Sequence, residues 1–375
     1  YPVSLFSDLK NQSNNAIAFR GFGLAMVDVM RALTINNFGK FSTLDSNTFK
    51  TEYTQTESQN LKLIPYSLDG KPQAPKPLNE SIDNWYKPTD NELKYFKDVI
   101  ENTIKKDKKI SDINFITQPI SKIASRVFLD LQNKAVNHNL NEKELQKIVL
   151  NWLDDEDIEH HTLQSTKIST YKLIECYINM ALGKTSISLD YCIGQVWRHC
   201  QPTLYASFSH AEIDSVIIEE VITLDDRSKR YSYGPPIESM QQILALIDAN
   251  ILSLDFANNP NIEITEKGWL LTNKEGASIT TNIMINSVLD APKLLDVNAP
   301  IIKSLLSNDL IQPVHTKLGI DTRVDGCVIS YNSEKQLPIS VLGRLSKGSV
   351  IGVDAILECC GKRIEDWAES FAKRI

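Results

Sequence analysis

The chain has 375 residues, of which 42% are hydrophobic and 23% charged, so it can bury the cores of two or three globular domains. Its formal net charge of −7 argues against a general nucleic-acid-binding protein and against an anionic membrane surface as partner. No apolar run is long enough for a membrane span, and the six cysteines lack CxxC or framework spacing. We therefore expect a cytoplasmic protein with reduced thiols.

Residues 15–33 have the pattern of a strand, a glycine turn and a helix. The apolar run 16–19 suits a buried parallel strand, Gly21 and Gly23 follow it, and apolar residues then recur at helical spacing. In this context the first glycine allows a tight turn, and the second lets backbone N–H groups approach a pyrophosphate at the helix N-terminus. The third fingerprint position is Met26, so a glycine-rich turn without a ligand remains the alternative.

The segment that follows is predicted to contain strands and then an extended loop. Residues 40–44 and 48–53 alternate apolar and polar side chains on either side of a turn-forming break, which indicates a β-hairpin. Residues 61–66 are a further short strand. Four prolines between residues 65 and 77 exclude a helix or a central strand there, so this part is an extended loop.

The rest of the chain changes period twice. From residue 90 to residue 249 apolar positions recur at helical spacing, which predicts a helical insert that serves as a lid or a substrate-selecting domain. After residue 250 the period falls towards two, which indicates strands at residues 251–256, 262–264, 269–271, 279–285, 326–331 and 339–342. Helices are expected at residues 299–308 and at about 350–373.

These patterns together predict an α/β protein. A Rossmann-like dinucleotide-binding unit occupies residues 1–89, a large and mostly α-helical insert occupies residues 90–250, and residues 251–375 supply a C-terminal return of strands and a closing helix.

Three stretches, in this order, resemble motifs of one family. Residues 20–29 (RGFGLAMVDV) are similar to an RGLGL…D segment, residues 233–239 (YGPPIES) to a GPP segment, and residues 342–348 (LGRLSKG) to a C-terminal glycine motif. All three motifs belong to the bacterial FAD-NAD(P)-binding proteins, a flavoprotein family, and the resemblance covers nearly the whole chain. It implies an FAD-dependent oxidoreductase that uses NAD(P)H, with the NAD(P) unit nested in the FAD unit. Because family members usually begin with an FAD-binding GxGxxG segment, we expect a fragment whose missing partner is that N-terminal segment.

The resemblance also implies a set of cofactor-binding residues. They are Arg20, Gly21, Phe22, Gly23, Leu24, Asp28, Ser67, Gly343, Arg344 and Gly348. The turn at residues 21–23 would hold the pyrophosphate of NAD(P)H, and the glycines at 343 and 348 would face the flavin or its ribityl-phosphate arm. The alternative for the second motif is a glycine-rich loop without a ligand.

Several of these residues have a second interpretation. Asp28 could serve only the dipole of its helix, and Arg20 could pair with a neighbouring carboxylate. Ser67 lies where the family has a Ser-Arg-Arg-Gly-like segment, but here Lys71 is the nearest cation, which leaves the choice between NADH and NADPH open.

Other polar clusters predict no metal site and no catalytic residue. The acids and histidines of residues 154–161 are interpreted as an exposed loop between helices instead of metal ligands. His199 and His210 are interpreted as packing or substrate-pocket residues, since no orienting acid can be assigned to them.

The function expected from the sequence is therefore a flavin- and NAD(P)H-dependent oxidoreductase of a small molecule. By fold-level analogy its chemistry would be of the monooxygenase kind. Two alternatives remain: a non-catalytic nucleotide-binding or sensing protein with a relic flavoprotein fold, and a flavin-free NAD(P) dehydrogenase.

Overall fold

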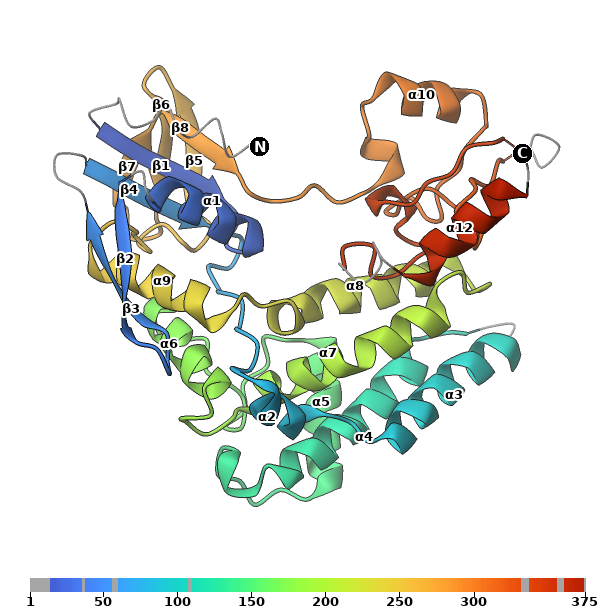
Figure 1. Ribbon diagram of the computed structural model, residues 1–375, viewed down its shortest axis with the longest axis horizontal. Coiled ribbons are helices and arrows are strands. Elements are labelled where there is room, and N and C mark those ends of the chain that lie inside the picture. The colour runs from blue at the N-terminus through green and yellow to red at the C-terminus, as the bar shows by residue number, and fades with distance from the viewer. Residues whose placement is uncertain are drawn as a thin grey trace.

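The computed structural model of the chain describes residues 14–35, 38–55, 60–106, 110–331, 337–355 and 361–373 (Figure 1). Its strands are β1 (Asn14–Arg20), β2 (Gly39–Asp45), β3 (Lys50–Gln55), β4 (Asn60–Tyr66), β5 (Asn261–Thr265), β6 (Gly268–Thr272), β7 (Ser278–Thr281) and β8 (Ile283–Asn286). Its α-helices are α1 (Leu24–Thr34), α2 (Glu80–Asp83), α3 (Asp90–Lys106), α4 (Asn114–Asp130), α5 (Glu142–Asp154), α6 (Thr170–Ala181), α7 (Leu189–Phe208), α8 (Ser215–Ser232), α9 (Ile237–Asp248), α10 (Pro300–Ser307) and α12 (Lys362–Ala372). Short 3₁₀ helices are η2 (Asn84–Tyr86), η3 (Gln132–Lys134), η4 (Leu294–Asp296) and η5 (Arg344–Ser346). Among the residues described, no helix is long and apolar enough to cross a membrane.

A parallel sheet in the order β4-β1-β8 is the framework of the N-terminal part. In its centre Ala18 of β1 lies opposite Ile64 of β4 on one side and Met284 of β8 on the other. The sheet therefore combines two strands from the first 66 residues with one strand that returns after the helices, more than 200 residues later.

Both faces of β1 are buried, which explains why its sequence is continuously apolar. Ile17 and Phe19 belong to the main core, together with Met26 and Met30 of α1. Ala18 belongs instead to a small cluster that includes Leu271 of the antiparallel sheet β5-β6-β7. Side chains alternate between the faces of a strand, so the parallel sheet forms the middle of three layers, between α1 and the antiparallel sheet.

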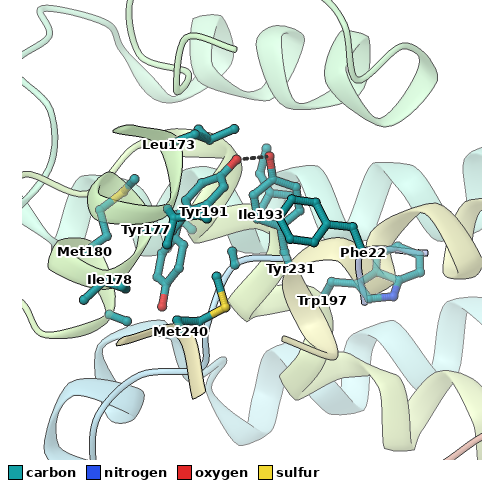
Figure 2. Packing of buried hydrophobic residues seen from close by; sticks show 14 of the residues in the cluster. Phe22, Leu173, Tyr177, Ile178, Met180, Tyr191, Ile193, Trp197, Tyr231 and Met240 are labelled. Carbon is teal, nitrogen blue, oxygen red and sulfur yellow. Dashed lines mark hydrogen bonds between the residues drawn. The ribbon is translucent and has the colours of Figure 1, made fainter. Parts of the chain in front are cut away.

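The helices α2–α8 form a helical body that lies below this sheet and shares its main hydrophobic core (Figure 1). Helix α7 lies at its centre, packed against α3, α4 and α8, and most of its side chains are buried. The aromatic core includes Trp197, Tyr177 and Tyr231 (Figure 2). Buried hydroxyl groups are paired there: the Tyr177 and Tyr231 oxygens lie 3.2 Å apart, and Tyr231 donates to Asp190 at 2.8 Å. This pairing avoids the cost of an unsatisfied buried polar group.

The C-terminal part has a small core of its own, formed by Leu294, Ile311, Ile320 and Val328. One extended segment after β8 leads across to it, and α10 and α12 lie on the far side of the molecule from β1 (Figure 1). Charged pairs hold this part against α8. They are Lys347–Asp226 at 2.7 Å, Lys229–Asp354 at 3.3 Å and Lys317–Glu219 at 3.0 Å.

Most of the predicted elements are confirmed. The strand–turn–helix unit, the β2–β3 hairpin, β4, the extended proline loop, the helices between residues 90 and 249, the strands β5–β8 and helix α10 all form where the sequence indicates them. The predicted strand 279–285 is split in two at Asn282.

Three predicted strands are wrong. Residues 251–256 make only a single bridge, Leu252 to Leu63, because the Ser253 hydroxyl accepts from the Asp255 N–H at 3.2 Å and turns the chain. Residues 326–331 and 339–342 likewise make isolated bridges instead of ladders, through Val328 to Thr322 and through Cys327 to Ser340.

The start of the predicted last helix is also wrong. Residues 350–355 form turns, because Gly352 has a φ of 74°, which interrupts a right-handed helix. Residues 356–360 lie outside the described part, and the helix itself is α12, Lys362–Ala372.

Candidate functional site

The carboxyl ends of the three parallel strands meet at the glycine turn. Gly21 N–H donates to the Tyr66 carbonyl at the end of β4 at 2.8 Å, and Ser287 N–H, just after β8, donates to the Arg20 carbonyl at 2.9 Å. In open α/β sheets, ligands bind outside the carboxyl ends of the strands, where the strand order reverses. The β1 end, with β4 on one side and β8 on the other, is such a point.

Gly21 and Gly23 differ in whether the fold requires glycine at their positions. Gly21 has a φ of 118°, and a Cβ there would meet Ser287 Oγ at 3.0 Å, so the fold itself demands glycine. Gly23 has an extended backbone with a φ of −116°. A Cβ at Gly23 would come no closer than 3.6 Å to Gln73, an ordinary van der Waals contact. Packing therefore gives no reason for glycine at residue 23, whereas a ligand held against the backbone would.

Gly23 is the N-cap residue of α1 and has no side chain with which to cap the helix. The first N–H groups of a helix lack intrahelical partners, and the helix dipole adds partial positive charge there. The next residue, Leu24, is 41% exposed and lines a cleft. The N-terminus of α1 therefore opens towards a space in which a ligand could lie.

This cleft has a volume of about 880 Å³ and lies between the N-terminal part, the helices and the C-terminal part. Its floor is one face of α7, formed by Arg198, Gln201, Pro202, Tyr205, Ala206 and Ser209. One wall contains Leu24, Lys76 of the proline loop and Tyr233 at the end of α8. The opposite wall contains His210, Val324, Val350, Asp354, Ala355 and Arg363. Apolar and aromatic side chains form most of the floor and walls.

One end of the cleft gathers positive charge. Arg198 donates to one oxygen of Asp83, and Nε2 of His199 lies 3.4 Å from the other. Burial raises the pKa of Asp83, but the His199 contact and Arg198 outweigh burial and lower the pKa overall. Burial lowers the pKa of Lys76, and nearby Arg198 lowers it further. Asp83 is therefore ionised, and its charge is already shared between two neighbours.

The other end is a network that joins the cleft to the C-terminal part. Asp354 lies 2.5 Å from Arg344 and 3.3 Å from Lys229. Burial raises the pKa of Asp354, but these cations outweigh burial and hold the pKa below its usual value. Tyr205 donates to the buried carboxylate of Asp225 at 3.0 Å, and burial followed by Asp225 raises the pKa of Tyr205. Tyr205 is consequently a fixed, protonated part of the cleft floor.

His210 joins the opposite wall to the helical body. Its backbone N–H donates to the Ser349 carbonyl at 2.6 Å, and its ring Nδ1 lies 3.1 Å from the Thr322 carbonyl. Burial lowers the pKa of His210. His199 and His210 thus both line the cleft, in agreement with the interpretation as pocket residues.

The residues expected at the turn lie in different surroundings. Phe22 is 7% exposed and packs in the main core (Figure 2), so its side chain faces protein and not the cleft. Arg20 and Asp28 are exposed. The Ser67 hydroxyl accepts from the Gly70 N–H at 3.0 Å and thereby fixes the start of the proline loop near the end of β4.

The C-terminal motif is not part of the cleft lining. Gly348 has a φ of 116° and would clash with Val314, which explains this glycine by the fold alone. At Gly343 no described atom lies within 4 Å of a Cβ. Arg344 reaches the cleft only through its ion pair with Asp354. The structure thus brings Leu24 and Asp354 to one cleft, but not the two glycine motifs themselves.

The acidic loop after α5 engages cations of the proline loop and of α8. Asp157 lies 2.5 Å from Lys71, and Glu156 lies 3.7 Å from Arg230. Across the described ranges, no group of three or more His, Cys, Asp or Glu residues could hold a metal ion.

Sequence reasoning missed Asp83, Gln73, Lys76 and Ser287. Asp83 ends a four-residue helix and meets His199 across 116 positions, a proximity that no local pattern encodes. Lys76 carries one usable signal, since it is a lysine among prolines in a loop that follows a predicted parallel strand.

No protein-family model matches the chain, and no curated protein matches it.

Proposed function

We propose that the chain binds the pyrophosphate of NAD(P)H at the Gly21–Gly23 turn and acts as an FAD- and NAD(P)H-dependent oxidoreductase. The observation that carries the proposal is Gly23. It is the N-cap residue of α1 at the carboxyl edge of a parallel sheet, and a Cβ there would make only an ordinary van der Waals contact with Gln73 at 3.6 Å, so packing does not require glycine. A Rossmann-like unit made of β1, α1, β4 and β8 would bind the nucleotide in this way.

The cleft fits the rest of such a ligand. It begins at Leu24, directly after the turn, and continues over Pro202, Tyr205 and Ala206 of the helical body. Cofactor pockets are mainly apolar with a few directed polar groups. The helical body would then supply the floor against which the cofactor ring lies, which agrees with a substrate-selecting role for it.

When bound, the two cofactors supply hydride transfer from nicotinamide to flavin. The residues of this chain would bind and orient them: the α1 N-terminus receives the phosphates, and the α7 face excludes water from the ring. We propose that Gly343 and Arg344 contribute to the flavin site, since residue 343 has open space beside it and Arg344 is tied to the cleft through Asp354. A monooxygenase-like reaction and a cytoplasmic location belong to the same proposal.

Charge pairing near Ser67 favours NADH over NADPH. A 2′-phosphate needs a cation to receive it. Lys71 is paired with Asp157 at 2.5 Å, and Arg230 is paired with Asp69.

A second candidate is a nucleotide-binding protein without flavin. The described residues contain one parallel sheet, β4-β1-β8, and one such sheet accommodates one dinucleotide.

One experiment separates these candidates. NADH is titrated into the purified chain, and its binding is measured by energy transfer from the tryptophans of the chain. In a separate experiment the chain is incubated with FAD and then desalted. NADH binding together with retained flavin that NADH bleaches supports the oxidoreductase. NADH binding without retained flavin supports the second candidate. Absence of NADH binding at millimolar concentration contradicts both.

A further inference from the structure

The Lys76 end of the cleft carries more positive than negative charge. Lys76 and Arg198 are cations, and among the described residues Asp83 is the one carboxylate that contacts Arg198 and His199 there. Within the described chain, Lys76 makes no ion pair. The cluster thus has a net charge of at least +1 when Lys76 is protonated.

This excess charge has an energetic consequence. An ammonium group beside another cation is unfavourable, because like-charge repulsion opposes the charged form. Burial and then Arg198 lower the pKa of Lys76, while the Asp83 charge acts in the opposite direction. A bound anion beside Lys76 would offset this repulsion, and charge-assisted hydrogen bonds to an oxyanion are strong.

The surroundings of Lys76 indicate what carries this anion. The same cleft is lined by Leu24, Pro202, Tyr205 and Ala206, which offer apolar and aromatic surface. Inorganic phosphate has no apolar part to cover that surface, whereas an organic acid has one.

We propose that Lys76, beside Arg198 and His199, is the carboxylate-recognition subsite for an organic acid with an apolar body. The inference depends on the proposed function for the identification of this acid as the substrate. The charge arrangement itself needs no cofactor, so the two proposals can fail separately.

Benzoate is the probe, and benzamide is its uncharged counterpart. Both are titrated calorimetrically into the 375-residue chain and into Lys76→Met, Lys76→Arg and Lys71→Met. Lys71 is the matched control, since it lies on the same loop but is paired with Asp157 and does not line this cleft. We expect benzoate to bind more tightly than benzamide. Lys76→Met should weaken the affinity for benzoate about tenfold, whereas Lys76→Arg and Lys71→Met should retain the wild-type affinity.

Three outcomes would overturn the proposal. Equal binding of benzoate and benzamide would mean that charge is not recognised. Equal loss in Lys76→Met and Lys71→Met would mean a general effect of surface charge. If inorganic phosphate or NADH displaces benzoate at a concentration below the benzoate concentration needed for binding, Lys76 binds a phosphate group instead of a carboxylate. Lys76 is exposed, so its variants are expected to fold, and circular dichroism checks this.

Discussion

Substitution of Gly23 by aspartate separates stability from nucleotide binding. The backbone at residue 23 is extended, and the nearest atoms to a Cβ there belong to the Gln73 side chain at 3.6 Å. An aspartate therefore fits without strain. Aspartate is also a favoured N-cap residue, worth a few tenths of a kcal/mol over glycine, and its charge gains about 0.3–1 kcal/mol from the helix dipole. We expect Gly23→Asp to raise the free energy of unfolding by up to about 1 kcal/mol.

The same substitution should impair nucleotide binding. Its carboxylate would accept the N–H groups that a phosphate needs. It would also lie about 4 Å from the phosphate, where repulsion between unit charges is about 1 kcal/mol in water and about 4 kcal/mol near a protein surface. The expected loss of NADH affinity is therefore between about fivefold and a thousandfold.

Two assays and two control variants compare the effect of Gly23→Asp on stability with its effect on NADH binding. Urea denaturation measures the free energy of unfolding, and NADH titration measures affinity. Gly23→Ser supplies an uncharged N-cap side chain, so it should stabilise α1 and weaken NADH binding less than aspartate does. Ala277→Asp adds the same charge at an exposed position between β6 and β7, outside the cleft lining, and should leave NADH affinity unchanged.

Two results would refute this reasoning. If Gly23→Asp is at least as stable as the wild type and binds NADH equally well, the phosphate does not lie at the turn. If Gly23→Asp is strongly destabilised, packing does require glycine at residue 23, and the observation behind the proposed function is lost.

Two further predictions concern stability. Gly234→Ala should lower the free energy of unfolding by about 2–3 kcal/mol in urea denaturation, because the added Cβ would lie 1.6 Å from the Ala74 carbonyl oxygen. A loss of stability smaller than that of Gly343→Ala would contradict this prediction. Asp354→Asn should destabilise the protein by about 1–2 kcal/mol at neutral pH. The pKa of Asp354 is lowered from its usual 3.8, so its contribution is present above that value and is lost as the pH falls below it. The stability difference between wild type and Asp354→Asn should therefore shrink as the pH falls below 3.8 and through the lowered pKa, and a difference that stays constant on acidification would oppose the assignment.

Local patterns predicted the elements whose side-chain periodicity shows which faces are buried. The run Ala16–Ile17–Ala18–Phe19 is apolar because both faces of β1 are buried, and Gly21 marks its end because the backbone there needs a positive φ. The helical period between residues 90 and 249 was equally informative, since each of these helices buries one face against its neighbours.

The failures have identifiable physical causes. Alternation at residues 251–256 resembles a strand, but the Ser253 side chain bonds locally to Asp255 and competes with the ladder. Phe22 lies between two glycines, so the sequence could not tell whether its side chain faces a ligand or the core; it faces the core. The Asp83–His199 contact joins α2 to α7, and sequence spacing carries no information about it.

An NMR titration of the chain labelled with ¹⁵N-glycine tests whether NADH binds at the Gly21–Gly23 turn. The sequence has 15 glycines, so the spectrum is simple, and single substitutions assign the signals of Gly21 and Gly23. On addition of NADH, we expect the largest shifts at these two signals and none at Gly276 in the turn between β6 and β7. Unchanged Gly21 and Gly23 signals in the presence of saturating NADH would contradict this prediction.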